Sequence, residues 1–207
     1  MQRFVSILIV TIALGSGQAL AQEVTGATIT WYGNFIATRT KIVRDETVPT
    51  GQRNTDSDVT APAANTDRII ATAGSNFGFG YCLVGSPTDA VVTVRHVYKI
   101  PPPGIADRKT GKMVLTFGPI IQRRLNRYYL IGHGTSQMNT FPIGLWTLQV
   151  WYGDRLLAEK TFNVVRQEPG AQEPAVHAPS SAAATASPPS TTQTCAPLVS
   201  MLLEAAN

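Results

Sequence analysis

The sequence has few of the residues on which most catalytic and metal-binding chemistry depends. Only two cysteines and three histidines occur among its 207 residues. It contains no glycine-rich phosphate loop, no cysteine spacing of the zinc-binding type and no nucleotide-binding fingerprint. These absences argue against nucleotide-dependent and zinc-dependent proteins. We therefore expect a protein that is not an enzyme and that needs no metal and no cofactor.

Long apolar runs are also scarce, and the clearest one lies at the start of the chain. Arg3 gives a positive start, residues 4–14 form the run, and residues 19–21 (ALA) match a small-residue cleavage site. Together they predict a secretory signal peptide over residues 1–21. The run is too short to span a bilayer, and no cysteine follows the cleavage site to carry a lipid. We expect an exported bacterial protein, periplasmic or secreted, with no transmembrane segment after signal removal.

The last part of the chain lacks large apolar side chains. Residues 167–197 consist mainly of Ala, Pro, Ser, Thr and Gln, and such a composition buries too little surface to offset the entropy of ordering. We predict a disordered tail over 167–207. Its short apolar end, residues 198–206 (LVSMLLEAA), either frays, which is the favoured interpretation, or docks on the domain. Residues 24–166 remain as one domain, a normal size for a β-sandwich.

Charge is modest as well. The formal net charge is +4 and 14% of the residues are charged, a balance that does not call for nucleic acid, so none is expected as a partner. The densest basic and aromatic cluster consists of Arg123, Arg124, Arg127, Tyr128 and Tyr129. We interpret it as solvated strand arginines beside packed tyrosines, in preference to a binding stripe.

Alternation of apolar and polar residues is the feature that the sequence has in abundance. It is clearest over residues 141–165, which predict a closing β-hairpin with its turn at Gly153-Asp154. Lys160 falls in the inward phase of the second strand, beside Ala158 and Phe162. A charge in that phase predicts either a bulge or a strand at a sheet edge.

Further strands precede the hairpin. In the first of them Ala27, Ile29 and Trp31 are expected to share one face. Gly78 and Gly80 lie opposite the aromatic face of another strand and indicate close backbone approach or a bulge. About eight or nine short strands separated by turn signals predict an all-β, immunoglobulin-like antiparallel sandwich. The strands before the hairpin are expected at 25–32, 35–43, 67–73, 77–84, 90–98, 112–117 and 121–131, with a long surface loop at 44–66.

The two cysteines allow a disulfide but do not require one. An exported pair favours a bond. However, Cys82 lies in an apparent core strand and Cys195 lies in the predicted tail. The alternative is that Cys82 is a small buried hydrophobic residue and that Cys195 pairs with another chain. A bond would hold the end of the tail against the domain.

Two histidines are candidates for a site. His96 falls in an apolar strand phase and is interpreted as a buried core histidine, whereas His133 lies between two glycines and is expected in an exposed loop. The alternative to a binding or structural role is a periplasmic copper carrier or a hydrolase. The copper site would use His133, Met138 and Met113, and the hydrolase would use His133 with the 44–66 loop.

Two aromatic residues mark the predicted partner surface. Trp151 is expected to face outward, and Tyr152 lies at the hairpin turn. Aromatic side chains on a sheet face can mark a binding surface. The alternative is that a loop or the tail covers Trp151. The expected partner is a protein of the cell envelope.

A set of aromatic, glycine and hairpin residues spans most of residues 24–165. Its members are Trp31-Tyr32-Gly33-Asn34-Phe35, residues 72–81 (TAGSNFGFGY), Gly85, Arg95-His96, Gly144, Trp146, Gly153-Asp154-Arg155, Phe162 and Val164. The set resembles an exported bacterial family catalogued only as a domain of unknown function, and the FGFGY stretch and the closing hairpin are its most distinctive parts. The resemblance implies an exported β-sandwich, and it supplies no activity.

Overall fold

The computed structural model describes residues 22–72, 74–134, 142–167 and Cys195. Within these ranges the chain forms twelve strands and no helix, and therefore no helix there is long and apolar enough to cross a membrane. The predicted signal peptide lies outside the described residues. So does the predicted tail, apart from Gln167 and Cys195.

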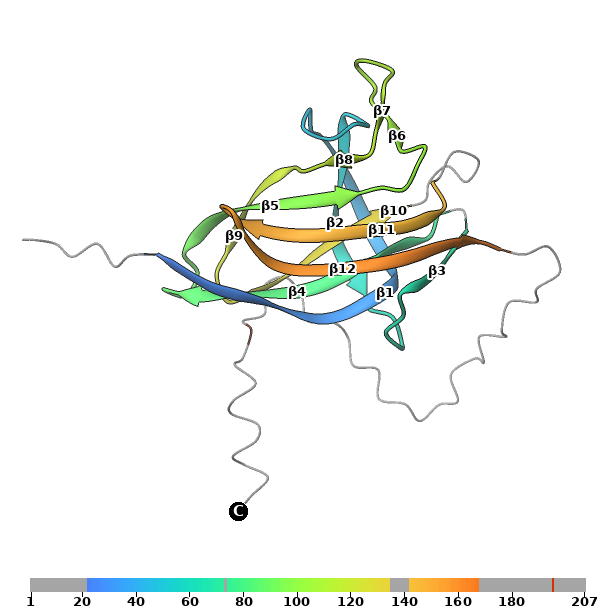
Figure 1. Ribbon diagram of the computed structural model, residues 1–207. Helices are drawn as coiled ribbons and strands as arrows, with labels where there is room; N and C mark the ends of the chain where they lie inside the picture. The colour runs from blue at the N-terminus through green and yellow to red at the C-terminus, as the bar shows by residue number, and fades with distance from the viewer. Residues whose placement is uncertain (1–21, 73, 135–141, 168–194, 196–207) are drawn as a thin grey trace, which may run out of the picture.

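The first sheet has four antiparallel strands in the order β10-β4-β1-β2 (Figure 1). The long strand β1 changes partner along its length, because residues 23–35 pair with β4 and residues 36–44 pair with β2. The four strands are β1 (Glu23–Arg44), β2 (Gln52–Thr60), β4 (Asn76–Ser86) and β10 (Arg127–Gly134).

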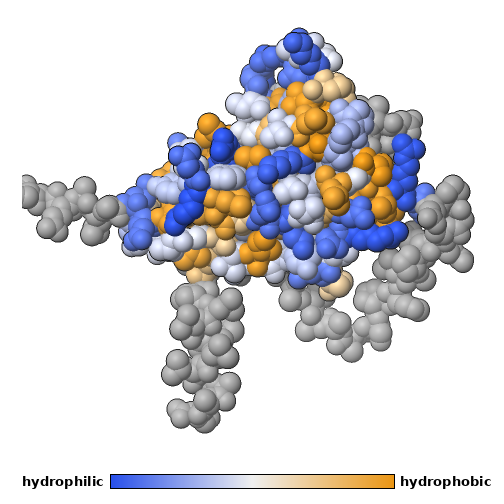
Figure 2. Space-filling view, in the orientation of Figure 1, coloured by the Kyte–Doolittle hydropathy of each residue, from blue (hydrophilic) through white to orange (hydrophobic). Residues whose placement is uncertain are grey.

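The second sheet has the order β3-β12-β11-β5-β8, and β9 also pairs with β5. Among the strand pairs of the described residues, β3–β12 alone is parallel. A separate hairpin of β6 and β7 projects from the sandwich, and hydrophilic residues gather at its tip in Figure 2. The strands are β3 (Arg68–Ala71), β5 (Val91–Lys99), β6 (Ile105–Ala106), β7 (Met113–Val114), β8 (Thr116–Phe117), β9 (Ile120–Arg124), β11 (Gly144–Tyr152) and β12 (Arg155–Arg166).

An aromatic core joins the two sheets. The Phe77 ring of β4 lies edge-on to Trp146 of β11, with ring centroids 5.5 Å apart, and to Phe162 of β12, with centroids 5.4 Å apart. All three side chains are fully buried. The prediction of an all-β, immunoglobulin-like antiparallel sandwich closed by a hairpin is confirmed.

The predicted number of strands, eight or nine, is too low. The predicted strand 112–117 divides into β7 and β8, and 121–131 divides into β9 and β10 because Asn126 makes a turn with φ 60°. By contrast, 25–32 and 35–43 form one strand, because β1 continues through Gly33, which takes φ 134° without a break in pairing.

The prediction of a surface loop over 44–66 is also wrong for part of its length. Residues 52–60 form β2, which pairs with the second half of β1. The turn between the strands is held by Asp45, whose carboxylate accepts hydrogen bonds from Thr47 N and Arg53 Nε, both at 3.0 Å. This strand is polar apart from Val59, so apolar alternation could not reveal it.

A β-bulge reverses the predicted phase of the first strand. The register shifts between Ile29, which pairs with Tyr81, and Trp31, which pairs with Gly80. Ile29 therefore packs against the core, whereas Trp31 lies on the outer face of the sheet, and Tyr32 takes the inward position instead. One inserted residue is enough to exchange the faces, because side chains alternate with a period of two.

The edge explanation for Lys160 is confirmed. Strand β3 pairs only with residues 163–166 of β12, so Lys160 lies on the part of β12 that has β11 alone as a neighbour. Its Nζ sits 3.7 Å from the centroid of the Tyr32 ring. The charge is thus accommodated at the rim of the core by a cation–π contact.

Candidate functional site

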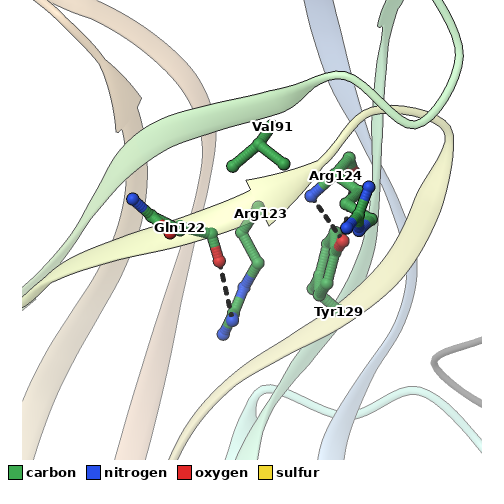
Figure 3. Close-up of a pocket in the computed structure, with 5 residues that line it drawn as sticks. All are labelled: Val91, Gln122, Arg123, Arg124 and Tyr129. Carbon is green, nitrogen blue, oxygen red and sulfur yellow. Dashed lines mark hydrogen bonds between the residues drawn. The ribbon is translucent and has the colours of Figure 1, made fainter.

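A surface pocket lies where β5, β9 and β10 meet (Figure 3). Its volume is about 290 Å³. We call it the Arg123 pocket, and it is lined by Val91, Gln122, Arg123, Arg124 and Tyr129. Two arginines in one small depression give it a positive character.

The tyrosine of the pocket is held by the backbone of β9. The Tyr129 hydroxyl accepts a hydrogen bond from Arg124 N at 2.7 Å and donates one to the Arg124 carbonyl at 3.1 Å (Figure 3). Because both bonds end on backbone atoms, the ring has a fixed position beside β9.

The Arg123 guanidinium packs on this fixed ring. Its Cζ is 4.6 Å from the Tyr129 ring centroid, and one of its NH₂ groups donates to the Gln122 carbonyl at 3.3 Å. Its Nε is buried and has no hydrogen-bond partner in the described part of the chain, whereas the guanidinium as a whole also interacts with the Tyr81 hydroxyl, through its charge and a side-chain hydrogen bond. A buried donor without an acceptor is uncommon in folded proteins and calls for an explanation.

Arg127, next to the pocket, is already paired. Its guanidinium forms two hydrogen bonds with the Asp89 carboxylate, at 2.6 Å and 2.8 Å, and these bonds lower the pKa of Asp89. Arg124 reaches the Asp89 carbonyl at 3.0 Å but not its carboxylate. The Asp89 carboxylate is therefore engaged by Arg127, and the charge of Arg124 also contributes to the lowered pKa of Asp89. Among the ion pairs of the described residues, none involves Arg123.

A buried polar pair lies in the core on the same side of the sandwich. The Tyr81 hydroxyl and His96 Nε2 are 2.8 Å apart in a hydrogen bond. Burial raises the pKa of Tyr81 to about 12, and the charge of Arg123 partly offsets this rise. Burial also lowers the pKa of His96 well below its usual value, with a further contribution from the charge of Arg123. Both groups are therefore neutral at pH 7.

A family model described as "Domain of unknown function (DUF3859)" matches residues 25–164. The chain belongs to this family. No curated protein shows significant sequence similarity to it.

Two solved structures are similar to the DUF3859 chain. An immunoglobulin-like protein from Pseudomonas aeruginosa is 22% identical, with a TM-score of 0.48 over 72% of this chain and 100% of that one. A beta-D-glucoside glucohydrolase from Trichoderma reesei is 9% identical, with a TM-score of 0.29 over 67% of this chain and 19% of that one.

His96 and His133, the two histidines of the DUF3859 domain, both lie within strands. His96 is buried, as predicted. The expectation that His133 lies in an exposed loop is wrong, because it belongs to β10 and its ring centroid is 4.9 Å from that of Trp146. The glycines beside it are strand residues, and Gly132 is required by the close approach of the Phe35 ring. Burial lowers the pKa of His133 to about 4.

The residues of the predicted copper and hydrolase alternatives are not brought together by any described contact. Met113 is half exposed on β7, and Met138 lies outside the described residues. In the described part of the DUF3859 domain, no group of three or more His, Cys, Asp or Glu side chains is placed to hold a metal ion.

The predicted partner surface consists of two residues that the structure separates. Trp151 faces outward and is half-buried. Its indole N–H donates a hydrogen bond to Gln149 Oε1 at 2.9 Å, and the Arg95 guanidinium covers part of its ring. Tyr152 packs against the core. Both side chains are half-buried and keep some exposed surface, and their role as a partner contact stays a prediction.

The structure joins Cys82 and Cys195 in a disulfide. The sequence placed Cys82 in a core strand, and the strand is indeed β4, but this residue points to the outer face, in the same phase as Gly78 and Gly80. The outward phase explains how a buried strand residue can meet a cysteine 113 positions further along the chain.

Sequence reasoning found the arginines and Tyr129 of the Arg123 pocket but missed its other parts. Val91 looks like any strand residue, and Gln122 is a polar strand position without a motif. Asp89, which decides that Arg127 is paired, sits in a turn with φ 64°. A distance of 38 positions between Asp89 and Arg127 gives no local signal.

Proposed function

We propose that the chain is an exported binding domain of the bacterial cell envelope, and that it recognises an acidic segment of a protein partner at the Arg123 pocket. The observation that carries this proposal is the position of Arg123. Its guanidinium lies over the Tyr129 ring, and its buried Nε has no acceptor in the described residues.

A carboxylate suits this arrangement. Arginine presents several N–H donors in a planar group that matches a carboxylate. Stacking on Tyr129 holds that group in place before a ligand arrives, so less side-chain entropy is lost on binding. Within the described ranges, no carboxylate forms an ion pair with Arg123 or Arg124. We infer that a carboxylate of the partner supplies an acceptor for these arginines.

Binding is favoured over catalysis by the same geometry. A hydrolytic site needs a nucleophile, a base and a group that orients the base. The pocket offers two arginines, a glutamine, a valine and a tyrosine whose hydroxyl is engaged by the backbone. These groups are suited to recognising a negative charge and not to transferring a proton.

The proposal is tested by titrating the isotope-labelled protein with an acetylated tetraglutamate peptide and, separately, with a tetralysine peptide. We expect saturable amide shifts at Gln122, Arg124 and Tyr129 with the acidic peptide only. Arg123→Gln should weaken binding about tenfold or more, because a hydrogen bond to a charged group contributes about 1.5–3 kcal/mol.

Lys112→Gln is the matched control, since it removes one positive charge from the end of the distant β6–β7 hairpin. It should leave the affinity almost unchanged. Equal weakening by Lys112→Gln and Arg123→Gln would mean that the peptide responds to net charge alone, and the proposed pocket would then be wrong.

A further inference from the structure

The disulfide fixes a point of the C-terminal region on the outer face of the four-stranded sheet. The Cα atoms of Cys82 and Cys195 are 6.1 Å apart, and Cys195 N donates a hydrogen bond to the Asn126 carbonyl at 2.9 Å. Residue 195 is thus attached both covalently to β4 and by a backbone bond to the turn that precedes β10.

The face beside this point carries an aromatic and aliphatic surface. On β10, Tyr128 pairs with Cys82 and Leu130 pairs with Gly80, so both lie on the same face as the disulfide. The rings of Trp31 and Phe35 lie 5.8 Å apart on that face. We call this surface the Trp31 strip, and its members are Trp31, Phe35, Tyr128 and Leu130.

Glycines allow the strip to lie close to the sheet. A Cβ on Gly80 would be 2.4 Å from the Trp31 indole nitrogen, and a Cβ on Gly132 would be 2.8 Å from the Phe35 ring. Trp31, Tyr128 and Leu130 nevertheless stay half-buried, which leaves apolar surface of each accessible. Accessible apolar surface of this kind is stabilised by a further apolar cover.

The residues that follow Cys195 have the composition of such a cover. Leu198, Met201, Leu202 and Ala205 have the spacing i, i+3, i+4, i+7, which would place them on one side of a helix. Ser200 and Glu204 would fall on the other side, together with the apolar Val199 and Leu203. A short helix is only marginally stable alone in water, so this segment needs a surface on which to form.

The segment starts within reach of the strip. Residue 198 is three positions beyond the anchored Cys195, a span of at most about 10 Å. Gly80, under the Trp31 ring, is two positions along β4 from Cys82, or about 7 Å. The tether makes contact intramolecular, with an effective concentration on the order of millimolar, which suits a weak apolar contact.

We propose that residues 198–206 dock as a short, mainly apolar helix on the Trp31 strip, and that the Cys82–Cys195 disulfide holds them there. Leu198, Met201 and Leu202 face the strip. Reduction of the disulfide releases the segment and uncovers Trp31. This inference is independent of the Arg123 pocket.

The test uses the oxidised full-length exported chain with labelled Leu and Met methyl groups. We expect nuclear Overhauser contacts from Met201 and Leu202 to the Trp31 indole and the Leu130 methyls. Leu202→Asp should abolish them with the disulfide intact, whereas Ser200→Asp, on the other side, should retain them. Cys195→Ser should also lose them and increase the quenching of Trp31 fluorescence by acrylamide.

Two outcomes would overturn the inference. In the first, Met201 and Leu202 methyls show no contact with the domain in the oxidised chain. In the second, the contacts appear between differently labelled molecules in a mixed sample, which would assign the strip to a second copy. The Leu202→Asp variant keeps the test valid even if Cys195→Ser fails to fold.

Discussion

The two faces of β4 differ in the way they tolerate a side chain. The inner face carries Phe77, Phe79 and Tyr81, all fully buried, and the outer face carries Gly78, Gly80 and Cys82. The inner face fills the space between the sheets. The outer face leaves space open, so that a ring from β1 and the anchored Cys195 can lie directly on the sheet.

The comparison shows that one strand can be sensitive to substitution on both faces for opposite reasons. Inner positions lose stability when a side chain is shortened, because a cavity forms. Outer positions lose stability when a side chain is added, because neighbouring atoms already occupy the site. At Gly78 the obstacle is backbone, since a Cβ would be 2.2 Å from the Ile131 carbonyl oxygen.

The largest expected loss of stability comes from a substitution on the inner face of β4. Phe79→Ala should lower the free energy of unfolding by about 3–5 kcal/mol, because it removes a fully buried ring between the sheets. Urea denaturation measures the change. Leu145→Ala, at a side chain that is 64% exposed, should cost about 0.5 kcal/mol or less. Similar losses for the two variants would show that the inner face is not the core.

The second expected effect is a pH dependence of stability that arises from His96 and His133, the two histidines that face the core beside β4. Both pKa values are lowered in the folded protein, to about 4 for His133 and well below the usual value for His96. The unfolded chain binds these protons near pH 6.5. Between that pH and about 4 the unfolded state therefore holds more protons, and stability falls as pH is lowered. For His133 the loss is at most about 3 kcal/mol, since part of the ring is exposed.

His133→Phe isolates this contribution. A phenyl ring keeps a flat side chain against Trp146 and removes the titrating group. The slope of unfolding free energy against pH should decrease by up to about 1.4 kcal/mol per pH unit in the acid range. The remaining slope belongs to His96 and, toward the lower end of the range, to carboxylates whose pKa is lowered, such as Asp89. An unchanged slope in this variant would contradict the burial of a neutral His133.

Much of the fold could be predicted from the sequence wherever one face of a strand is buried. The alternation in 77–84 placed Phe77, Phe79 and Tyr81 together, and the hairpin at 141–165 was found with its turn. Strand β2 could not be predicted, because its backbone pairs with β1 while all its side chains except Val59 are polar.

The bulge between Ile29 and Trp31 shows a second physical limit on predicting the fold from the sequence. A single inserted residue leaves no pattern of its own in the sequence, yet it moves Trp31 from the expected inner face to the outer face. The candidate site could likewise be predicted only in part. Arg123 and Tyr129 form a visible cluster, but the pairing of Arg127 with Asp89 depends on contact between distant segments.

The smallest expected change in the free energy of unfolding is at Gly80. This substitution is also the most direct test of how the outer face of β4 is packed. Gly80→Ala should lower the free energy of unfolding by about 1–3 kcal/mol, because the new methyl group would lie 2.4–2.5 Å from atoms of the Trp31 indole. In a Trp31→Ala background this obstacle is absent. The same substitution should then be neutral or stabilising by about 0.5–1 kcal/mol, because alanine loses less backbone entropy than glycine when a strand forms.

Gly78→Ala serves as the matched control for this cycle. Its obstacle is the Ile131 carbonyl and not the indole, so its cost should be the same with and without Trp31. The coupling energy between Gly80 and Trp31 should therefore exceed about 0.5 kcal/mol, while that between Gly78 and Trp31 should lie near zero. If both glycines couple equally to Trp31, the indole does not lie on Gly80, and the outer face is open for a reason other than the placement of this ring.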